Sequence, residues 1–114
     1  VLVAQVEALE AGRPDPLGYQ ADLGEVYWGS LYASDGRGLL AGPDDAVWRE
    51  VVDRDGWNHV HLWAEGDHHV IELNGARTVD ARDTAFTTGV LAFQLHEGPA
   101  CEVRYANARI RPLR

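Results

Sequence analysis

Apolar and polar residues alternate along most of this chain, in short runs separated by turns rich in glycine and aspartate. A period of two residues is typical of β-strands that bury one face. Short strands at even spacing favour an antiparallel β-sandwich. The strands that this pattern predicts are residues 1–9, 17–23, 26–33, 57–65, 68–73, 76–81, 88–96 and 100–112.

The residues between the strands support this division. Gly66-Asp67 and Asn74-Gly75 each separate two alternating runs, which predicts two-residue hairpin turns. Gly24-Glu25 predicts a tight turn that makes 17–33 a hairpin. Loops are predicted over the intervening segments, at 10–16, 34–42, 53–56, 82–87 and 97–99.

One helix is predicted, at about residues 44–53, directly after Pro43. Asp44 is placed to cap it, and the acidic residue that follows suits the positive end of the helix dipole. Its apolar stripe consists of Val47, Trp48, Val51 and Val52. We expect Trp48 to pin the helix to the edge of the sandwich.

Alternation also assigns side chains to faces. The core side is predicted to hold Asn58, Val60, Leu62 and Ala64, and also Leu91, Phe93 and Leu95. The opposite side holds Trp57, His59, His61 and Trp63 in one strand, and Val90, Ala92, Gln94 and His96 in another. Gln20 and Asp22 likewise share a face opposite Tyr19, Ala21 and Leu23. Polar and aromatic side chains of these types are suited to handling sugars.

Composition limits the class of protein. The chain has 114 residues, enough for a single domain spanning 1–114, and its net charge of −8 argues against nucleic acid or an anionic membrane as partner. It has no stretch of about 20 apolar residues and no signal peptide. It has no methionine and opens within a strand pattern, so we expect a piece of a longer protein with a partner strand upstream.

Several phrases, taken in order, resemble the 3-keto-disaccharide hydrolase domain family, which has a concanavalin A-like (glucanase-type) jelly roll fold. The matching phrases are Gly18 to Gly24, Tyr27 to Tyr32, Trp57 to His59, Leu73 to Gly75, Gly89 to His96 and Val103 to Ile110. The resemblance implies an all-β antiparallel sandwich with one short helix, and further strands upstream of Val1. The segment Val3 to Glu7 lacks an arginine that the family has there.

The resemblance implies cleavage of glycosides that carry a ketone at C3. The ketone makes the C2 proton acidic, a base removes it, the aglycone leaves from C1, and water then adds back. This chemistry needs a base, a group or divalent metal that stabilises the enolate, and an acid for the leaving oxygen. No glycosyl-enzyme intermediate is required.

Two residues are the candidates for acid–base catalysis. His96 is the first choice for base or metal ligand because histidine titrates near neutral pH, against the alternative of a histidine bonded to a loop carbonyl. Asp22 is the second, against the alternative of capping the turn at 24–25.

The predicted substrate contacts are less specific. Gln20 and Gln94 are candidates for binding hydroxyls or the keto oxygen, and Tyr27, Trp28 and Tyr32 for walls of the sugar site, each against a packing or surface role. Arg104 is a further candidate, although an ion pair with Glu102 is the simpler interpretation. His59 and His61 have a spacing that can bind metal, against two exposed histidines on a strand.

Three hypotheses remain open at this stage. The chain is an enzyme acting on 3-keto-glycosides, a non-catalytic carbohydrate-binding module on the same fold, or an incomplete domain without activity of its own. The expected partner is a small carbohydrate, and upstream strands or a second copy of the chain are expected to cover the exposed edge. The resemblance also implies a periplasmic or secreted location.

Overall fold

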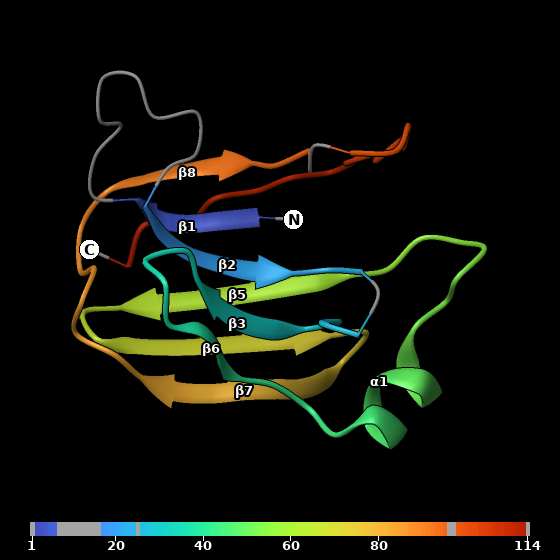
Figure 1. Cartoon of the computed structure of the whole chain (residues 1–114), viewed down its shortest axis with the longest axis horizontal. Coiled ribbons are helices and arrows are strands. Elements are labelled where there is room, and N and C mark those ends of the chain that lie inside the picture. Colours follow the sequence, from blue (N-terminus) through green and yellow to red (C-terminus); the bar gives the residue numbers. More distant parts are fainter. Residues whose placement is uncertain (1, 7–16, 25, 96–97, 114) are drawn as a thin grey trace.

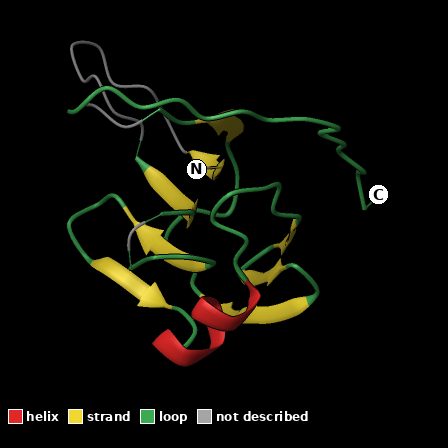
Figure 2. Cartoon of the chain, turned by 90° about the vertical axis from the view of Figure 1, so that its right-hand side faces the viewer, coloured by secondary structure: helices red, strands yellow, loops and turns green. Residues whose placement is uncertain are grey.

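The computed structural model describes residues 2–6, 17–24, 26–95 and 98–113, and it is a two-layer antiparallel β-sandwich with one short helix (Figure 1). One sheet has the strand order β4-β3-β2-β1-β8 and the other β5-β6-β7. The two sheets face each other as separate layers in Figure 2. The elements are β1 Leu2–Val6, β2 Gly18–Asp22, β3 Ser30–Ala33, β4 Gly38–Ala41, α1 Asp45–Val51, β5 Val60–Glu65, β6 His68–Leu73, β7 Ala76–Arg82 and β8 Val90–Phe93.

The core lies between β2 and β3 of the larger sheet and β6 and β7 of the smaller one. Its buried side chains are Tyr19, Ala21, Leu31, Ala33, Ile71, Val79 and Phe86. Val60 and Leu62 pack against this cluster from β5, as the alternation predicted. Burying such side chains stabilises the fold by roughly 1.5–3 kcal/mol for each large one.

The helix is shorter than predicted but it is anchored by the predicted residue. Trp48 is 1% exposed, and its Nε1 donates a hydrogen bond to Asp45 Oδ1 at 3.2 Å. The guanidinium groups of Arg49 and Arg54 lie over its ring. Asp44 occupies the N-cap position but makes no side-chain capping bond, so the prediction that it caps the helix is wrong.

Asn74 does more than form the predicted turn between β6 and β7. Its φ of +50° suits that turn, and Asn tolerates the left-handed region. Its side chain donates to the carbonyl of Val51 at 2.7 Å and to Asn58 Oδ1 at 2.8 Å, and it accepts from the N–H of His59 at 2.7 Å. A single turn residue therefore ties the end of α1 and the loop before β5 to the smaller sheet.

Several predicted boundaries are wrong. β5 begins at Val60 rather than at 57, and β8 begins at Val90 rather than at 88 and ends at Phe93. Residues 38–41, assigned to a loop, form β4, because two leucines flanked by small residues pair along β3. Residues 26–29 form a turn, so β3 begins only at Ser30. Residues 100–112 are not assigned as a strand, although they are extended alongside β8 in Figure 1.

The inner side of β8 is open to solvent. Phe93 pairs through Leu2 with Ala21, which places it on the core face, yet its side chain is 55% exposed. Leu91 and Leu95 are equally exposed, so the prediction that these three residues form core is wrong. The reason is that β1 and β8 extend beyond the edge of the smaller sheet, which stops at β5 (Figure 1).

A polar clamp joins the two sheets at one end of the sandwich. The hydroxyl of Tyr19 on β2 donates to Asp83, which follows β7. Arg37, in the turn between β3 and β4, donates to both oxygens of the same carboxylate, at 2.5 and 3.2 Å. The His69 ring packs 4.5 Å from the Tyr19 ring, and its Nε2 lies 3.4 Å from the Asp83 carbonyl oxygen.

The clamp makes stability depend on pH. The hydrogen bonds from Arg37 hold the pKa of Asp83 well below its usual range, and burial lowers the pKa of His69. Unfolded His and Asp take up protons near pH 6.5 and 3.9, above the pH at which the folded groups do so. Both groups therefore contribute fully to the free energy of unfolding above about pH 6.5. The contribution of His69 falls as pH drops below about 6.5, and that of Asp83 falls as pH drops below about 3.9.

We predict that Asp83→Asn lowers the free energy of unfolding at pH 7 by roughly 1–3 kcal/mol, because the Arg37 and Tyr19 donors lose a charged acceptor. It also removes the part of the acid-induced loss that occurs below about pH 4. Urea unfolding at pH 7, 5 and 3 measures both effects, with the exposed Asp55→Asn as control. An unchanged loss between pH 5 and 3 in Asp83→Asn would contradict the assignment.

Candidate functional site

Gln20 and Asp22 lie on the outer face of the larger sheet, as the alternation predicted, and Tyr32 lies beside Gln20 on the same face. Gln20 pairs with Tyr32 across β2 and β3, and Asp22 pairs with Ser30. Their neighbours Tyr19 and Ala21 point into the core, so the opposite side of the strand faces outward. All three side chains are half-buried.

The turn before β3 brings a second aromatic residue to this face. The N–H of Gly29 donates to the carbonyl of Asp22 and that of Ser30 to the carbonyl of Tyr27, each at 2.9 Å. The rings of Tyr27 and Tyr32 meet edge to face, with centroids 5.9 Å apart. We call Gln20, Asp22, Tyr27 and Tyr32 the outer-face cluster.

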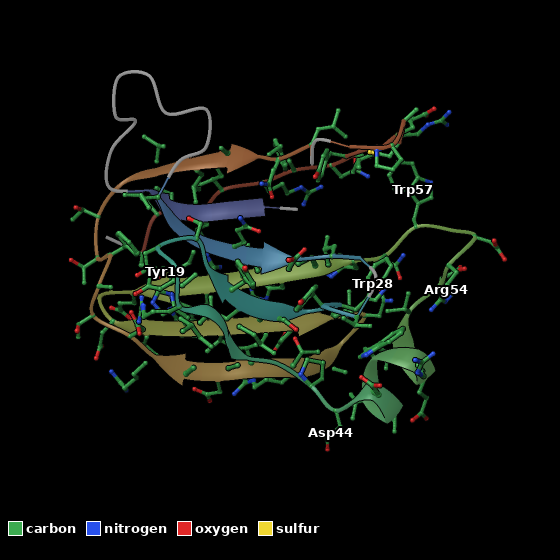
Figure 3. All side chains as sticks on the ribbon, viewed as in Figure 1. Tyr19, Trp28, Asp44, Arg54 and Trp57 are labelled. Carbon is green, nitrogen blue, oxygen red and sulfur yellow. The ribbon has the colours of Figure 1, made fainter. Side chains whose placement is uncertain are left out.

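Gly29 fixes this turn through a contact with the other sheet. Its φ is +71°, and its carbonyl accepts a hydrogen bond from the buried Thr78 hydroxyl on β7 at 2.6 Å. A β-carbon at Gly29 would lie 2.7 Å from Thr78 Oγ1, closer than real β-carbons come. Trp28, beside Gly29, is half-buried at the end of the sandwich opposite Tyr19 (Figure 3). The smaller sheet therefore helps to position the outer-face cluster.

The backbone register extends the outer face towards β8. Val3 on β1 pairs with Gln20 on one side and with Ala92 on the other. Because neighbouring strands are about 4.8 Å apart, Gln20 and Ala92 are separated by roughly 10 Å along the sheet. This span is comparable to a disaccharide lying across the strands.

Gln94 lies in a separate groove at the end of β8. The groove has a volume of about 280 Å³ and is lined by Phe93, Gln94, Leu95, Cys101, Glu102, Val103 and Tyr105. The Oε1 atom of Gln94 is buried there and has no hydrogen-bond partner among the residues that the structure describes. The Tyr105 hydroxyl donates to the Gln94 carbonyl at 3.2 Å, which holds the segment after residue 98 against β8.

Arg104, another predicted site residue, is not brought to the outer-face cluster. Arg104 Nε donates to Glu102, and both side chains are exposed, which confirms the ion pair that the residue types indicated. His96 lies outside the described residues. The structure therefore groups Gln20, Asp22, Tyr27 and Tyr32, and it places Gln94 and Arg104 on the far side of β1.

Two of the histidines on β5 and β6 are paired with carboxylates. His61 Nδ1 lies 3.5 Å from Glu72, and His68 Nε2 lies 2.6 Å from Asp80. His69 is buried beside Tyr19. Within residues 2–6, 17–24, 26–95 and 98–113, no three His, Cys, Asp or Glu side chains are grouped as metal ligands would be.

Sequence reasoning missed the residues that position the site. Thr78 and Asp83 act from the smaller sheet, and their partners are 49 and 64 residues away along the chain. The glycine in the Tyr-Trp-Gly phrase was the available signal, because an isolated glycine inside a predicted strand often marks a bulge or a close approach of another backbone. Nothing local in the sequence pointed to Thr78.

Comparison with known proteins gives one result. The sequence model of the 3-keto-alpha-glucoside-1,2-lyase-like domain matches residues 3–111. No curated protein and no solved structure gives a significant match. In the part of the chain that the structure covers, no helix has the length and apolar character needed to cross a membrane.

We predict that Gly29→Ala lowers the free energy of unfolding by roughly 2–4 kcal/mol, because it combines a left-handed φ with a clash against Thr78. Gly66→Ala is the matched control, since its φ is +58° and nothing lies within 4 Å. Denaturant unfolding should show the larger loss at Gly29, partly recovered in a Thr78→Ala background. Equal losses at the two glycines would mean that the contact with Thr78 is unimportant.

Proposed function

The chain belongs to the 3-keto-alpha-glucoside-1,2-lyase-like domain family, and we propose that it cleaves 3-keto-glycosides by elimination followed by hydration. The family match supports the substrate class, since it covers residues 3–111 of the 114. The observation that carries the proposal is the outer-face cluster, in which an amide and a carboxylate lie beside two tyrosine rings on the outer face of a sheet.

In the proposed reaction, a base takes the proton from C2 of the 3-keto sugar. The electron pair of that C–H bond forms an enolate with the C3 ketone and then expels the oxygen at C1, which receives a proton as it leaves. Water adds to the resulting double bond, with its hydroxyl at C1 and a proton returning to C2. The sum is hydrolysis, and no bond to the protein forms.

The outer-face cluster supplies the side chains for the first steps. Tyr27 and Tyr32 offer a ring wall for the apolar C–H face of the sugar. The Gln20 amide is suited to bond two adjacent sugar hydroxyls. Asp22 lies two residues further along β2, on the same face of the sheet. We assign proton transfer to His96 and Asp22, the two acid–base candidates of the sequence.

Gln94 and Trp28 are proposed as outer contacts of the same substrate. The buried Oε1 of Gln94 has no partner within the described part of the chain, so it is suited to accept a hydrogen bond from a sugar hydroxyl. Arg104 is already paired with Glu102, which weakens the proposal that it binds the sugar. No step is routed through a metal ion, because the acidic and histidine side chains of the described ranges form no ligand group.

The test is turnover of a 3-keto-glucoside in D₂O, with and without EDTA. We expect release of the aglycone with deuterium at C2 of the sugar at the earliest time points. Asp22→Asn and His96→Gln are expected to lower kcat by 10²–10⁴-fold, the range typical of lost acid–base catalysis. Glu50→Gln on α1, remote from the outer face, is the control and should keep full activity.

The outcomes separate the rival functions. Release without deuterium at C2 would rule out elimination. Binding of the 3-keto sugar without turnover, in a folded protein, would favour the alternative of a non-catalytic carbohydrate-binding module. Full activity in both Asp22→Asn and His96→Gln would remove the assigned acid–base roles while leaving the substrate class intact.

We also propose that a second copy of the chain covers the open side of β8. β8 is an edge strand of four uncharged residues, and the apolar residues on and beside it are exposed. Such an edge pairs readily with another strand. Light scattering should give the mass of a dimer, and Leu91→Lys should shift it to a monomer. A monomer of the unchanged chain at about 100 μM would contradict the proposal.

A further inference from the structure

Trp63 lies on the outer face of the smaller sheet, because its neighbour Leu62 packs against the core and side chains alternate along a strand. The smaller sheet is the layer opposite to the sheet that carries the outer-face cluster. Its side chain is 46% exposed in the second half of β5. It pairs with Val70 on β6, which in turn pairs with Asp80 on β7. Val70 is only 6% exposed although it faces outward, so it offers little surface of its own. The exposed apolar surface at the centre of this face is therefore chiefly the indole of Trp63.

Planar polar groups surround Trp63 on this face in one connected chain. His61 lies 3.5 Å from Glu72, Arg77 Nη2 lies 3.2 Å from Glu72 Oε1, and Arg77 Nη1 lies 3.6 Å from Asp80. His68 closes the chain at 2.6 Å from Asp80. The imidazole, carboxylate and guanidinium groups are thus held at fixed positions around Trp63 and Val70. We call these five polar residues the polar frame.

The polar frame carries little net charge, because Arg77 offsets one of its two carboxylates and both histidines are counted as neutral. Arg77 contacts both of its carboxylates, Glu72 and Asp80, and each carboxylate also has a histidine partner. The pKa of Glu72 is lowered chiefly by its bond from Arg77, and that of Asp80 by its bond from His68. The whole chain carries −8, so this face is a nearly neutral area on an acidic molecule. It suits an uncharged ligand with many hydroxyls better than a charged one.

We propose that the outer face of the smaller sheet binds an uncharged oligosaccharide, with one sugar ring stacked on Trp63 and adjacent hydroxyls bonded to the polar frame. An indole has a wide apolar face that fits the C–H side of a pyranose ring, and planar polar groups bridge neighbouring hydroxyls. The site does not depend on the cleavage chemistry, because it shares no residue with the outer-face cluster. It would hold a glycan chain on one side of the sandwich while the other side handles the reacting sugar.

Titration with maltohexaose and with cellohexaose, followed by NMR of the tryptophan indole N–H groups, tests the proposal. The Trp63 signal is identified as the one missing from Trp63→Phe. We expect it to shift with one hexasaccharide at a Kd of roughly 0.1–1 mM. Trp63→Ala should weaken binding at least tenfold, whereas Trp63→Phe keeps an aromatic face and loses less.

Matched controls separate this site from others and from damage to the fold. Trp57 is more exposed than Trp63 but lies in the loop before β5, so Trp57→Ala should leave the affinity unchanged. Trp63→Ala should also keep the wild-type turnover of a 3-keto-glucoside, which shows that the variant is folded. Should turnover be absent in all forms, an unchanged unfolding midpoint serves the same purpose.

Three results would overturn the proposal. One is the absence of any Trp63 shift at about 10 mM of either hexasaccharide. Another is a shift confined to Trp28, which would assign binding to the larger sheet. Equal affinity of Trp63→Ala and the unchanged chain would likewise place the sugar elsewhere.

Discussion

The carboxylate of Asp83 is the point on which the two layers depend. It accepts from the Tyr19 hydroxyl and from two nitrogens of Arg37, both on the larger sheet, while its own backbone continues from β7. Several hydrogen-bond donors stabilise the charged carboxylate strongly. Removing them would leave a charged group without partners, at a large cost in free energy. The clamp therefore fixes how the sheets are offset at this end. At the other end, the contact between Gly29 and Thr78 performs a similar task with neutral groups.

The offset of the sheets explains why the two outer faces differ. On the larger sheet, the hydrogen bond from Thr78 holds the turn before β3 in place. This turn brings the ring of Tyr27 against the ring of Tyr32, which pairs with Gln20. On the smaller sheet, three short antiparallel strands place Trp63 amid ion-paired side chains. Polar side chains point outward on both sheets because the apolar residues that alternate with them along each strand point into the core. The core thus leaves two surfaces available to ligands without disturbing the packing.

The sequence predicted most strands because their alternation is strong. β6 was predicted with its observed ends, and the faces of β2 and β5 were assigned correctly. Periodicity cannot say what lies opposite a strand, and so Leu91 and Phe93 were placed in a core that the smaller sheet does not reach. Local pattern also failed at 38–41, where pairing with β3 outweighs the glycine content. Gln20, Asp22 and Tyr32 could be grouped from register alone, but the role of Thr78 needs the tertiary structure.

The open side of β8 divides the sandwich into regions of unequal local stability. The amides of β2, β3 and β6 lie in paired strands whose core-facing side chains are buried, whereas residues 98–113 are exposed and form no strand. Local opening in that segment needs far less free energy than opening of the core strands. Its amide protons should exchange with solvent long before those of β6. The groove beside Gln94 is therefore built on the most easily opened part of the described chain, and occupancy of that groove would slow exchange there selectively.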